Sequence, residues 1–572
     1  MKLYFLLSFL LIASALPAQT PHDDELLRIA QEELTREWDQ YRKLSQPPYF
    51  ISYRINDIHS AAVASSFGSL VHSNQDHNRL LLVDVRVGDY KFDSSHPESG
   101  GNDAVFEQMA YQDRMGSTLP LDNKKEPIQL ELWENTENAY RSSLEMYKNL
   151  KNSVSTSKTT KPVDDFSQEE VVVHVDAPIA AFETLFDKKE WEGRIKKYTA
   201  RFLANQNIVT SYASLEVETE RKYFISTEGS RVVQNRVVAS LSISAAVRAD
   251  DGDIIPLHLS YLAYLPKELP SDNVIERDIE IMAAKLEKLR TAPIAEPYTG
   301  PAILHARAAG VFFHEIFGHR VEGHRLKNEF DGQTFKNKVN EQVLPKTLSV
   351  VFDPTLTHFN GQALNGSYLF DDEGVKAEKV TVVQDGVLKT FLMSRTPIDG
   401  FSKSNGHGRS ESGAYPVSRQ SNLIIQNKKE VQMSDLRKML INECKRDKKP
   451  YGYLFMDVIG GFTTTDRFMP NAFNIFPTEV YRVYVDGRPD ELVRGVDLIG
   501  TPLAMFAGIT AADDRSEIFT GFCGAESGSV PVTAISPSLF VKRIETQRKA
   551  AMKSETTLLP RPQEGVKTSV QH

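Results

Sequence analysis

The chain has 572 residues, more than one hydrophobic core usually organises, so two or more domains are expected. Hydrophobic residues make up 41% and charged residues 25% of it, which is an ordinary composition for a soluble globular protein. Asp and Glu (76) outnumber Lys and Arg (67), giving a formal net charge of −9. No basic stripe stands out, so these properties argue against nucleic-acid binding.

Residues 1–18 have the pattern of a secretory signal peptide. Lys2 supplies a short positive start, residues 3–12 are apolar except for Ser8, and small residues follow up to Ala18. Cleavage is expected after residue 15 or 18. An uncleaved anchor is the weaker alternative, because a ten-residue apolar run is short for a membrane helix. The mature protein is therefore expected to be periplasmic or secreted, without stable membrane insertion.

Residues 19–295 are predicted to form an N-terminal α+β domain. Apolar residues at three- and four-residue spacing predict helices over residues 26–41 and 276–290. Runs rich in β-branched and aromatic residues predict strands at residues 49–55, 80–87 and within 211–265. Residues 96–170 are polar and rich in Ser, Lys and Asp, so we interpret them as an insertion with helical pieces and a loose linker.

Residues 296–552 are predicted to form a mainly antiparallel β domain with one buried helix, which makes the whole fold α+β. Residues 302–325 have the pattern of one helical stretch. Strand-like segments flank Asp385-Gly386, a strong type I′ hairpin signal, and a second pair flanks Asp486-Gly487. Residues 553–572 are polar and contain proline, and are expected to be a disordered tail.

The residues that carry chemistry lie in the segment VFFHEIFGHRVEGH, residues 311–324. Two histidines and a glutamate on a helix can bind zinc and activate water, and His314, Glu315 and His319 provide these groups. Their spacing is H-E-x-x-x-H, so a regular helix would place the histidines about 140° apart. We therefore expect a π-bulge near Gly318. The alternative is a helix with scattered polar residues, but buried His and Glu side chains need partners.

Six segments in this order resemble the TldD/PmbA family of metallopeptidases, on the TldD side. They are HEIFGHRVEG at 314–323, DDEG at 371–374, QDGVL at 384–388, NGHGR at 405–409, RQSN at 419–422 and GFCG at 521–524. The resemblance covers roughly residues 20–545 and is strongest after residue 301. Export and the polar insertion depart from the pattern of this family, whose known bacterial pairs are mainly cytoplasmic.

The resemblance implies a ligand set and a mechanism. Zinc would be held by His314, His319 and Cys523, and Glu315 would act as general base towards water whose pKa zinc lowers to ~7. The PmbA side of the family lacks the zinc motif, so its presence here favours an active subunit. The resemblance also implies short or unfolded peptides as substrates, and a homodimer or a heterodimer with a related subunit.

The function expected from the sequence is thus that of an exported zinc-dependent peptidase, and two alternatives stay open. The chain could be a non-catalytic binding or scaffold subunit of a peptidase complex. It could also be a metal-dependent hydrolase of non-peptide amides, which the sequence does not separate from a peptidase.

The two cysteines of the chain, Cys444 and Cys523, allow a disulfide that would compete with metal binding. Cys444 shares a helical face with Leu436 and Leu440, which predicts a core thiol. Cys523 lies next to glycine in a segment expected to be a turn-like loop, a better setting for a ligand.

Other polar residues are open to two interpretations each. His324 is expected to be a surface histidine, with a substrate contact as the alternative. His407, Arg409 and Arg419 could orient a peptide carbonyl or carboxylate, or make structural loop contacts. The carboxylates of residues 371–373 could bind a hard cation, but loop carboxylates more often remain solvated.

Overall fold

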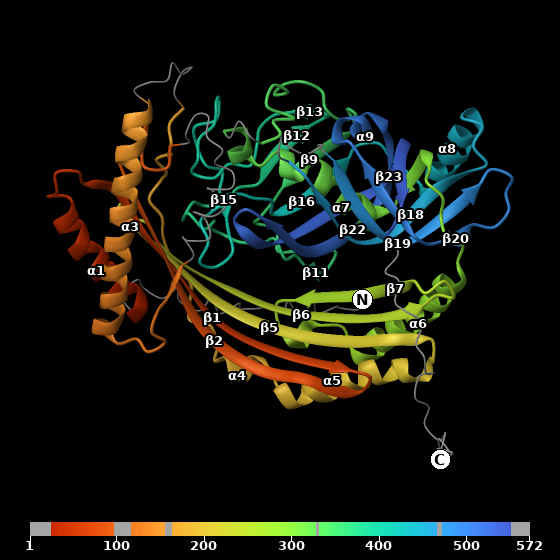
Figure 1. Cartoon of the computed structure of the whole chain (residues 1–572), viewed down its shortest axis with the longest axis horizontal. Coiled ribbons are helices and arrows are strands. Elements are labelled where there is room, and N and C mark those ends of the chain that lie inside the picture. Colours follow the sequence, from red (N-terminus) through yellow and green to blue (C-terminus); the bar gives the residue numbers. More distant parts are fainter. Residues whose placement is uncertain (1–23, 97–115, 155–162, 328–330, 466–471, 551–572) are drawn as a thin grey trace, which may run out of the picture.

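Figure 1 presents the computed structural model of the chain, which describes residues 24–96, 116–154, 163–327, 331–465 and 472–550. The predicted signal peptide and C-terminal tail lie outside these ranges, as do parts of the predicted insertion at 97–115 and 155–162. Within the ranges described, no helix combines the length and apolar character needed to cross a membrane.

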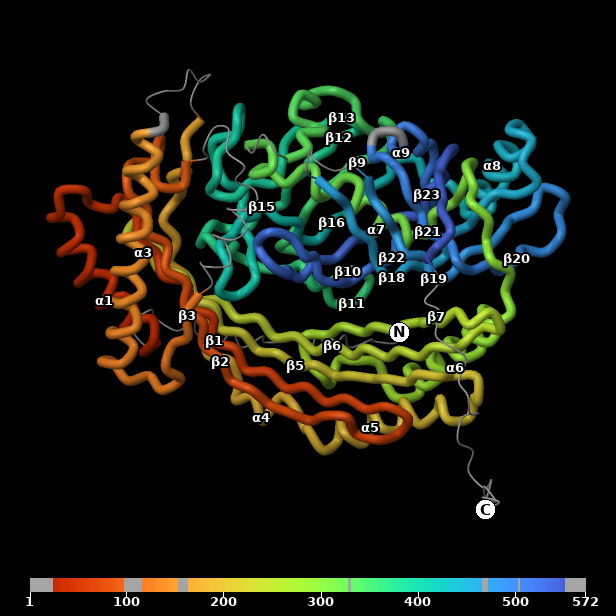
Figure 2. Tube along the Cα trace, in the orientation of Figure 1, coloured from red at the N-terminus to blue at the C-terminus, as the bar shows by residue number. Residues whose placement is uncertain are grey.

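The N-terminal half forms a curved sheet, and the C-terminal half lies over one face of it (Figure 1; Figure 2). The strand order is β3-β2-β1-β5-β6-β4, with β7 also paired to β6. The strands are β1 (Pro48–Ser66), β2 (Ser69–Val87), β3 (Ser117–Thr118), β4 (Val173–Val175), β5 (Ile208–Ser226), β6 (Arg231–Arg248) and β7 (Ile254–Ala263). The predicted strands are therefore present, and the longest continue well beyond the predicted ranges.

Two groups of helices cover the other face of this sheet. The first group is α1 (Glu25–Tyr41) and α3 (Lys125–Val154), and the second is α4 (Phe182–Leu185), α5 (Lys188–Ala200) and α6 (Asp272–Thr291). Both predicted helices are confirmed, and the Asp24 carboxylate caps α1 by accepting a hydrogen bond from the Leu27 amide at 3.0 Å. Helix α3 is one of the helical pieces predicted within residues 96–170, and its Ile128 and Leu132 side chains are fully buried against the sheet.

The C-terminal half is built on a twelve-stranded, mainly antiparallel sheet, as predicted. Its central order is β13-β12-β9-β16-β23-β21-β19-β18-β8. The strands are β8 (Thr299–Leu304), β9 (Leu348–Phe352), β12 (Val380–Gln384), β13 (Val387–Leu388), β16 (Asn422–Asn427), β17 (Glu430–Val431), β18 (Tyr451–Thr463), β19 (Phe473–Tyr484), β20 (Glu491–Val493), β21 (Val496–Gly500), β22 (Ile509–Ala525) and β23 (Gly528–Arg548). Positive φ angles of 51° at Asp385 and 79° at Gly386 confirm the type I′ hairpin.

Smaller elements complete this half of the molecule. They are α7 (Ala306–Ile316), α8 (Met433–Arg446), α9 (Pro502–Gly508), the short pairs β10 (His358–Phe359) with β11 (Gln362–Ala363) and β14 (Gly408–Arg409) with β15 (Val417–Ser418), and the 3₁₀ turns η3 (Gly318–Arg320) and η4 (Gly323–Leu326). The prediction of one helical stretch over 302–325 is wrong. Residues 302–304 pair with β18 and β23 instead, because a short buried apolar run fits a strand as well as a helix.

Candidate metal centre

Helix α7 carries the first two residues of the predicted site. All residues from 308 to 316 are buried, because α7 packs between β18, β22 and β23. Gly310 permits this approach, since a Cβ there would lie 3.2 Å from the Cβ of Ala534 on β23. His314 and Glu315 are 9% and 6% exposed, so they are polar groups within an apolar helix. Such groups need partners that replace water.

The π-bulge expected near Gly318 does not form, because the α-helix ends at Ile316. Phe317 leaves the helical conformation with φ −121° and ψ −51°, and η3 follows directly. Gly318 is required there for space, since a Cβ on it would lie 1.9 Å from Oε1 of Gln420. The tighter turn returns His319 to the side of His314, with ring centroids 5.0 Å apart and planes at 84°.

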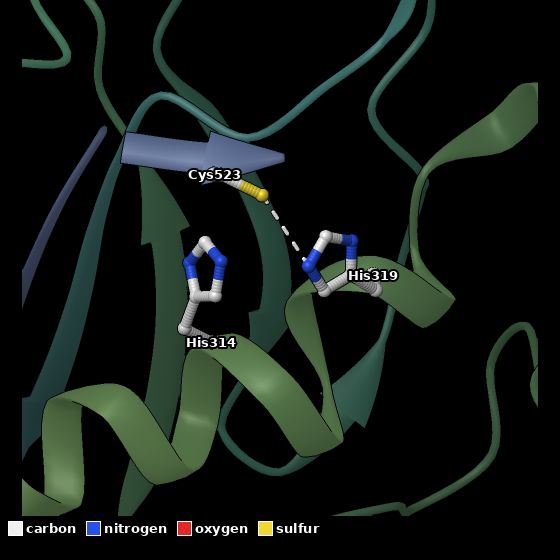
Figure 3. Close-up of side chains that lie close together, drawn as sticks. All are labelled: His314, His319 and Cys523. Atoms are coloured by element: carbon white, nitrogen blue, oxygen red, sulfur yellow. Dashed lines mark hydrogen bonds between the residues drawn. The ribbon is translucent and has the colours of Figure 1, made fainter. Parts of the chain in front are cut away.

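The third residue, Cys523, lies on β22 and not in the expected loop. Its partner across the β22–β23 hairpin is Val530. The Sγ atom lies 3.3 Å from Nε2 of His319, and one ligand atom each of His314, His319 and Cys523 lies within 4.8 Å of the other two. Figure 3 shows the three side chains pointing toward one another. Both Cys523 and Cys444 are free thiols, so the competing disulfide is not formed.

Glu322 contacts the ring nitrogen of His319 that faces away from Cys523. The sequence interpretation did not single it out. Its Oε2 lies 3.1 Å from Nδ1 of His319 and accepts a 2.9 Å hydrogen bond from Nε of Arg325. The carboxylate is fully buried. A carboxylate on the second ring nitrogen fixes the tautomer and orientation of a metal-binding histidine. The signal in the sequence was a glutamate three residues after a candidate ligand.

Arg419 and Gln420 close the site from the segment before β16. Arg419 donates to the Cys523 carbonyl at 2.5 Å and to its Sγ at 3.3 Å, and its Nε lies 3.6 Å from Oε1 of Glu322. The Gln420 amide nitrogen lies 3.4 Å from Nε2 of His314. Both side chains are fully buried. Arg419 therefore holds the Cys523 sulfur and the Glu322 carboxylate in place, which agrees with the structural one of its two sequence interpretations.

The charges of this cluster favour the metal-binding form of the cysteine. Burial by itself would raise the pKa of the Cys523 thiol, but His319 and His314 outweigh it and hold that pKa well below its ordinary value. Burial would lower the pKa of His319, but Cys523 and Glu322 raise it well above its ordinary value. Burial raises the pKa of Glu315. A thiolate is the ligand form of cysteine, and a carboxylate with a raised pKa is a stronger base.

Known proteins resemble this chain in sequence and in fold. Residues 297–548 match the family model described as the PmbA/TldA metallopeptidase C-terminal domain. Over these residues the chain is similar to the TldD/PmbA family. A metalloprotease from Archaeoglobus fulgidus is 32% identical over 272 residues, which cover 47% of this chain and 58% of that relative, less than two thirds of its length.

Two further similar proteins extend the comparison. A protein named zinc metalloprotease TldD homolog, from Saccharolobus solfataricus, is 23% identical over 337 residues, or 57% of this chain and 69% of its own. The solved structure of TldE from Thermococcus kodakarensis has a TM-score of 0.59, covers 91% of this chain and 100% of its own, and is 14% identical. At that identity the similarity establishes a common fold.

The remaining residues that the family motifs contain have structural contacts. His324 is largely buried and pairs with Glu526, which also accepts a 2.9 Å hydrogen bond from Arg325, so the surface position expected for it is wrong. His407 is fully buried and its Nε2 lies 3.1 Å from Ser421 Oγ. These contacts link the loops around the metal centre, and they leave neither histidine among its donor atoms.

Structural contacts also account for Arg409 and for the carboxylates of residues 371–373. Arg409 donates to the carbonyl groups of Gln420 and Pro531. Asp371 accepts from the Gly408 amide at 2.9 Å, and Asp372 pairs with Lys222 on β5. The expectation of solvated carboxylates is wrong, because buried amide and ammonium groups take the place of water around them.

Proposed function

We propose that this protein is a zinc-dependent peptidase in which Glu315 is the general base. The observation that carries the proposal is the convergence of three buried donor atoms, from His314, His319 and Cys523, within 4.8 Å of one another and beside Glu315. The family comparison supports metallopeptidase chemistry, and one relative bears zinc in its name.

The donor set fits zinc by type and by spacing. Two imidazoles and a thiolate are common zinc ligands, and a tetrahedral site with bonds of about 2.0–2.3 Å has donor–donor edges of about 3.3–3.7 Å. The Sγ–Nε2 distance of 3.3 Å between Cys523 and His319 matches such an edge. Glu322 already occupies the second ring nitrogen of His319, as expected around a ligating histidine. With three protein ligands, a catalytic zinc site keeps one open position.

Glu315 is placed to move protons in the reaction. Zinc held by this set supplies Lewis acidity, which lowers the pKa of water and polarises a carbonyl group. Glu315 Oε2 lies 4.0 Å from Nε2 of His319, so its carboxylate borders the donor atoms without being one of the three. Arg320 donates to the Glu315 backbone carbonyl at 2.7 Å and fixes the end of the helix. The Glu315 carboxylate takes a proton from water and delivers it to the leaving amine.

The substrates we propose are short or unfolded peptides bound in extended form. Within the described residues, β22 pairs on its second side with β17 only at Ala512 and Asp513. The edge next to Cys523 therefore carries no strand partner in that part of the chain. A peptide that adds to a strand edge is held mainly by its backbone, so broad sequence specificity follows. A folded protein offers no free strand and should resist cleavage until it is unfolded.

Export and assembly are further parts of the proposal. The signal-like residues 1–18 support function outside the cytoplasm. The structural similarity to a protein named TldE supports assembly either with a related subunit or with a second copy of this chain. Light scattering on the purified chain alone separates these two forms of assembly, because only self-association gives a dimer mass without a second protein.

The decisive experiment compares Glu315→Gln with the wild type in zinc content and peptide cleavage. The amide cannot accept the proton, so activity should fall about 10²–10⁴-fold while zinc remains bound. Glu443→Gln is the matched control, because Glu443 is also a buried helical glutamate, 8% exposed, on α8. Full activity in zinc-loaded Glu315→Gln would remove Glu315 from the mechanism.

The same assay tests the two alternatives. Wild-type protein that binds zinc but cleaves no peptide, with or without a partner subunit, would favour a scaffold role. Chelator-sensitive cleavage of simple amides without cleavage of peptide mixtures would favour a non-peptide hydrolase.

A further inference from the structure

A second group of metal-type side chains lies on the N-terminal sheet, far along the chain from α7. It consists of Asp57 and His59 on β1 and His77 on β2. His59 and His77 are directly opposite in the β1–β2 ladder, and Asp57 is opposite Arg79. Because side chains two apart on a strand share a face, all three project from the same face of the sheet.

The position of this group within its face is unusual. Along β1, the buried Tyr53 and Ile55 pack in the cluster under α1 and α3, and the buried Ala61 and Val63 pack in the cluster under α5. The three polar residues lie between these two apolar clusters. His59 faces Phe182 of α4, with ring centroids 6.0 Å apart. The group is half-buried, since the side chains of His77 and Asp57 are 28% and 15% exposed.

The three donor groups lie close enough to one another to share one metal ion. Nε2 of His77 lies 2.6 Å from Oδ1 of Asp57, and the two imidazole rings stack with centroids 3.7 Å apart and planes at 17°. One ligand atom from each residue lies within 4.8 Å of the other two. Nitrogen and oxygen ligands at about 2.0–2.2 Å from a metal are about 3.3 Å apart in a tetrahedral site, so the two rings would rotate out of their stacked arrangement to direct one nitrogen each at a shared ion.

Neighbouring charges complete the arrangement. Arg79 donates to Oδ2 of Asp57 at 2.7 Å and is itself anchored on the Pro120 carbonyl at 2.7 Å. Because Arg79 holds Oδ2, Oδ1 of Asp57 is free to face the histidines. Hydrogen-bonding partners orient metal-binding carboxylates in the same way. The Glu183 carboxylate on α4 is near enough to act electrostatically on His59. Burial and the neighbouring His77 lower the pKa of His59, which favours its neutral ring with a free lone pair.

We propose that Asp57, His59 and His77 bind a divalent transition-metal ion of the zinc, cobalt or nickel type, independently of the C-terminal centre. Imidazole and carboxylate ligands suit these ions. The ion joins β1 to β2 between two separate apolar clusters, so it stabilises the end of the hairpin that carries α4 and α5. The site does not depend on the proposed peptidase activity.

Cobalt binding distinguishes the two centres. A Co²⁺ ion on a thiolate has an intense near-ultraviolet charge-transfer band, and an ion held by nitrogen and oxygen has only weak visible bands. The untagged full chain, reduced and stripped of metal, should bind about two equivalents of Co²⁺. The Cys523→Ser chain should keep one equivalent without the charge-transfer band. Uptake of only one equivalent by the wild type, or none by Cys523→Ser, would overturn the proposal.

Variants of the cluster assign the second equivalent. His77→Asn and His59→Asn should each lose it while retaining the thiolate band, which also reports that the C-terminal half has folded. His72→Asn is the matched control, because His72 is an exposed histidine on the same strand, and it should keep both equivalents. A second equivalent that persists in both His77→Asn and His59→Asn would show that the metal binds elsewhere, and that the three residues form only a hydrogen-bonded group.

Discussion

The two cysteines of the chain are equally hidden from solvent, yet their surroundings give them opposite chemistry. Cys444 and Cys523 are 0% and 4% exposed. Burial raises the pKa of Cys444 to about 11, whereas the two nearby histidines outweigh burial at Cys523 and hold its pKa well below the ordinary value. Burial alone therefore does not decide whether a thiol is structural or reactive. The charges within reach of the sulfur decide it.

The surroundings of the two sulfur atoms explain this contrast. Cys444 lies on α8 in an apolar cluster with Leu436, Leu440 and Ile303. Cys523 lies against His319 and the guanidinium of Arg419. The first environment suits a neutral side chain that fills space. The second suits a thiolate anion, because positive groups surround it. A metal ion bound there would favour the thiolate further.

The largest effect is expected from Cys523→Ser. A serine hydroxyl is a poor zinc ligand at neutral pH, so the tightly bound zinc of the C-terminal centre should be lost, together with peptide cleavage. The measurement is the thiolate-to-cobalt charge-transfer band, with cleavage of a peptide mixture as a second readout. An active Cys523→Ser chain would mean that two histidines suffice to hold the metal, and the contrast between the cysteines would lose its functional meaning.

Glu322→Gln should have an intermediate effect. The amide keeps the size of the side chain but removes the charge that orients His319, and changes of this kind cost about 10–100-fold in metal affinity. Competition with a chromogenic zinc chelator measures this loss. Glu443→Gln again serves as the control, because that glutamate lies on α8 near Cys444. An unchanged zinc affinity would mean that Arg419 alone organises the site.

The same glutamate predicts a dependence of stability on pH. Burial would raise the pKa of Glu322, but His319 and Arg325 lower it from 4.5 to about 2. A carboxyl group with a depressed pKa stabilises the fold fully above about pH 4.5 and loses this contribution as pH falls toward 2. Metal-stripped wild type should therefore lose stability more steeply than Glu322→Gln between pH 5 and 2, measured by urea unfolding. Parallel curves would contradict the assignment.

Gly318→Ala should have a smaller effect. The added Cβ would collide with the end of the Gln420 side chain, which can yield only by leaving its position beside His314. Metal affinity should fall about tenfold, within the range for outer-shell changes. The double variant Gly318→Ala with Gln420→Ala removes the collision and should recover part of the loss. Failure of this rescue would mean that glycine is needed for the backbone conformation at residue 318 and not for the space beside Gln420.

Local sequence patterns predicted the helices and strands well, but they did not predict contacts between distant segments of the chain. The repeat of apolar residues predicted α1, and the Asp385-Gly386 turn predicted its hairpin, because both depend on neighbours in the chain. The turn after α7 packs Gly318 against Gln420, a residue of another segment, and the sequence suggested a π-bulge where this 3₁₀ turn forms. Placement of Cys523 beside the histidines came only from the family resemblance, and its role as a zinc ligand stays a prediction.

The smallest effect on the metal is expected from Cys444→Ser, which is the counterpart of the first variant. The serine places a hydroxyl among Leu436 and Leu440, so unfolding free energy should fall by about 1–3 kcal/mol. Zinc content and the charge-transfer band should be unchanged, because the Cys444 sulfur contacts the α8 cluster and none of the metal-centre donors. Urea unfolding and the cobalt spectrum measure the two quantities on one preparation. Equal loss of metal from Cys444→Ser and Cys523→Ser would show that the cysteines act together, and it would favour the disulfide that their free thiols in the structure argue against.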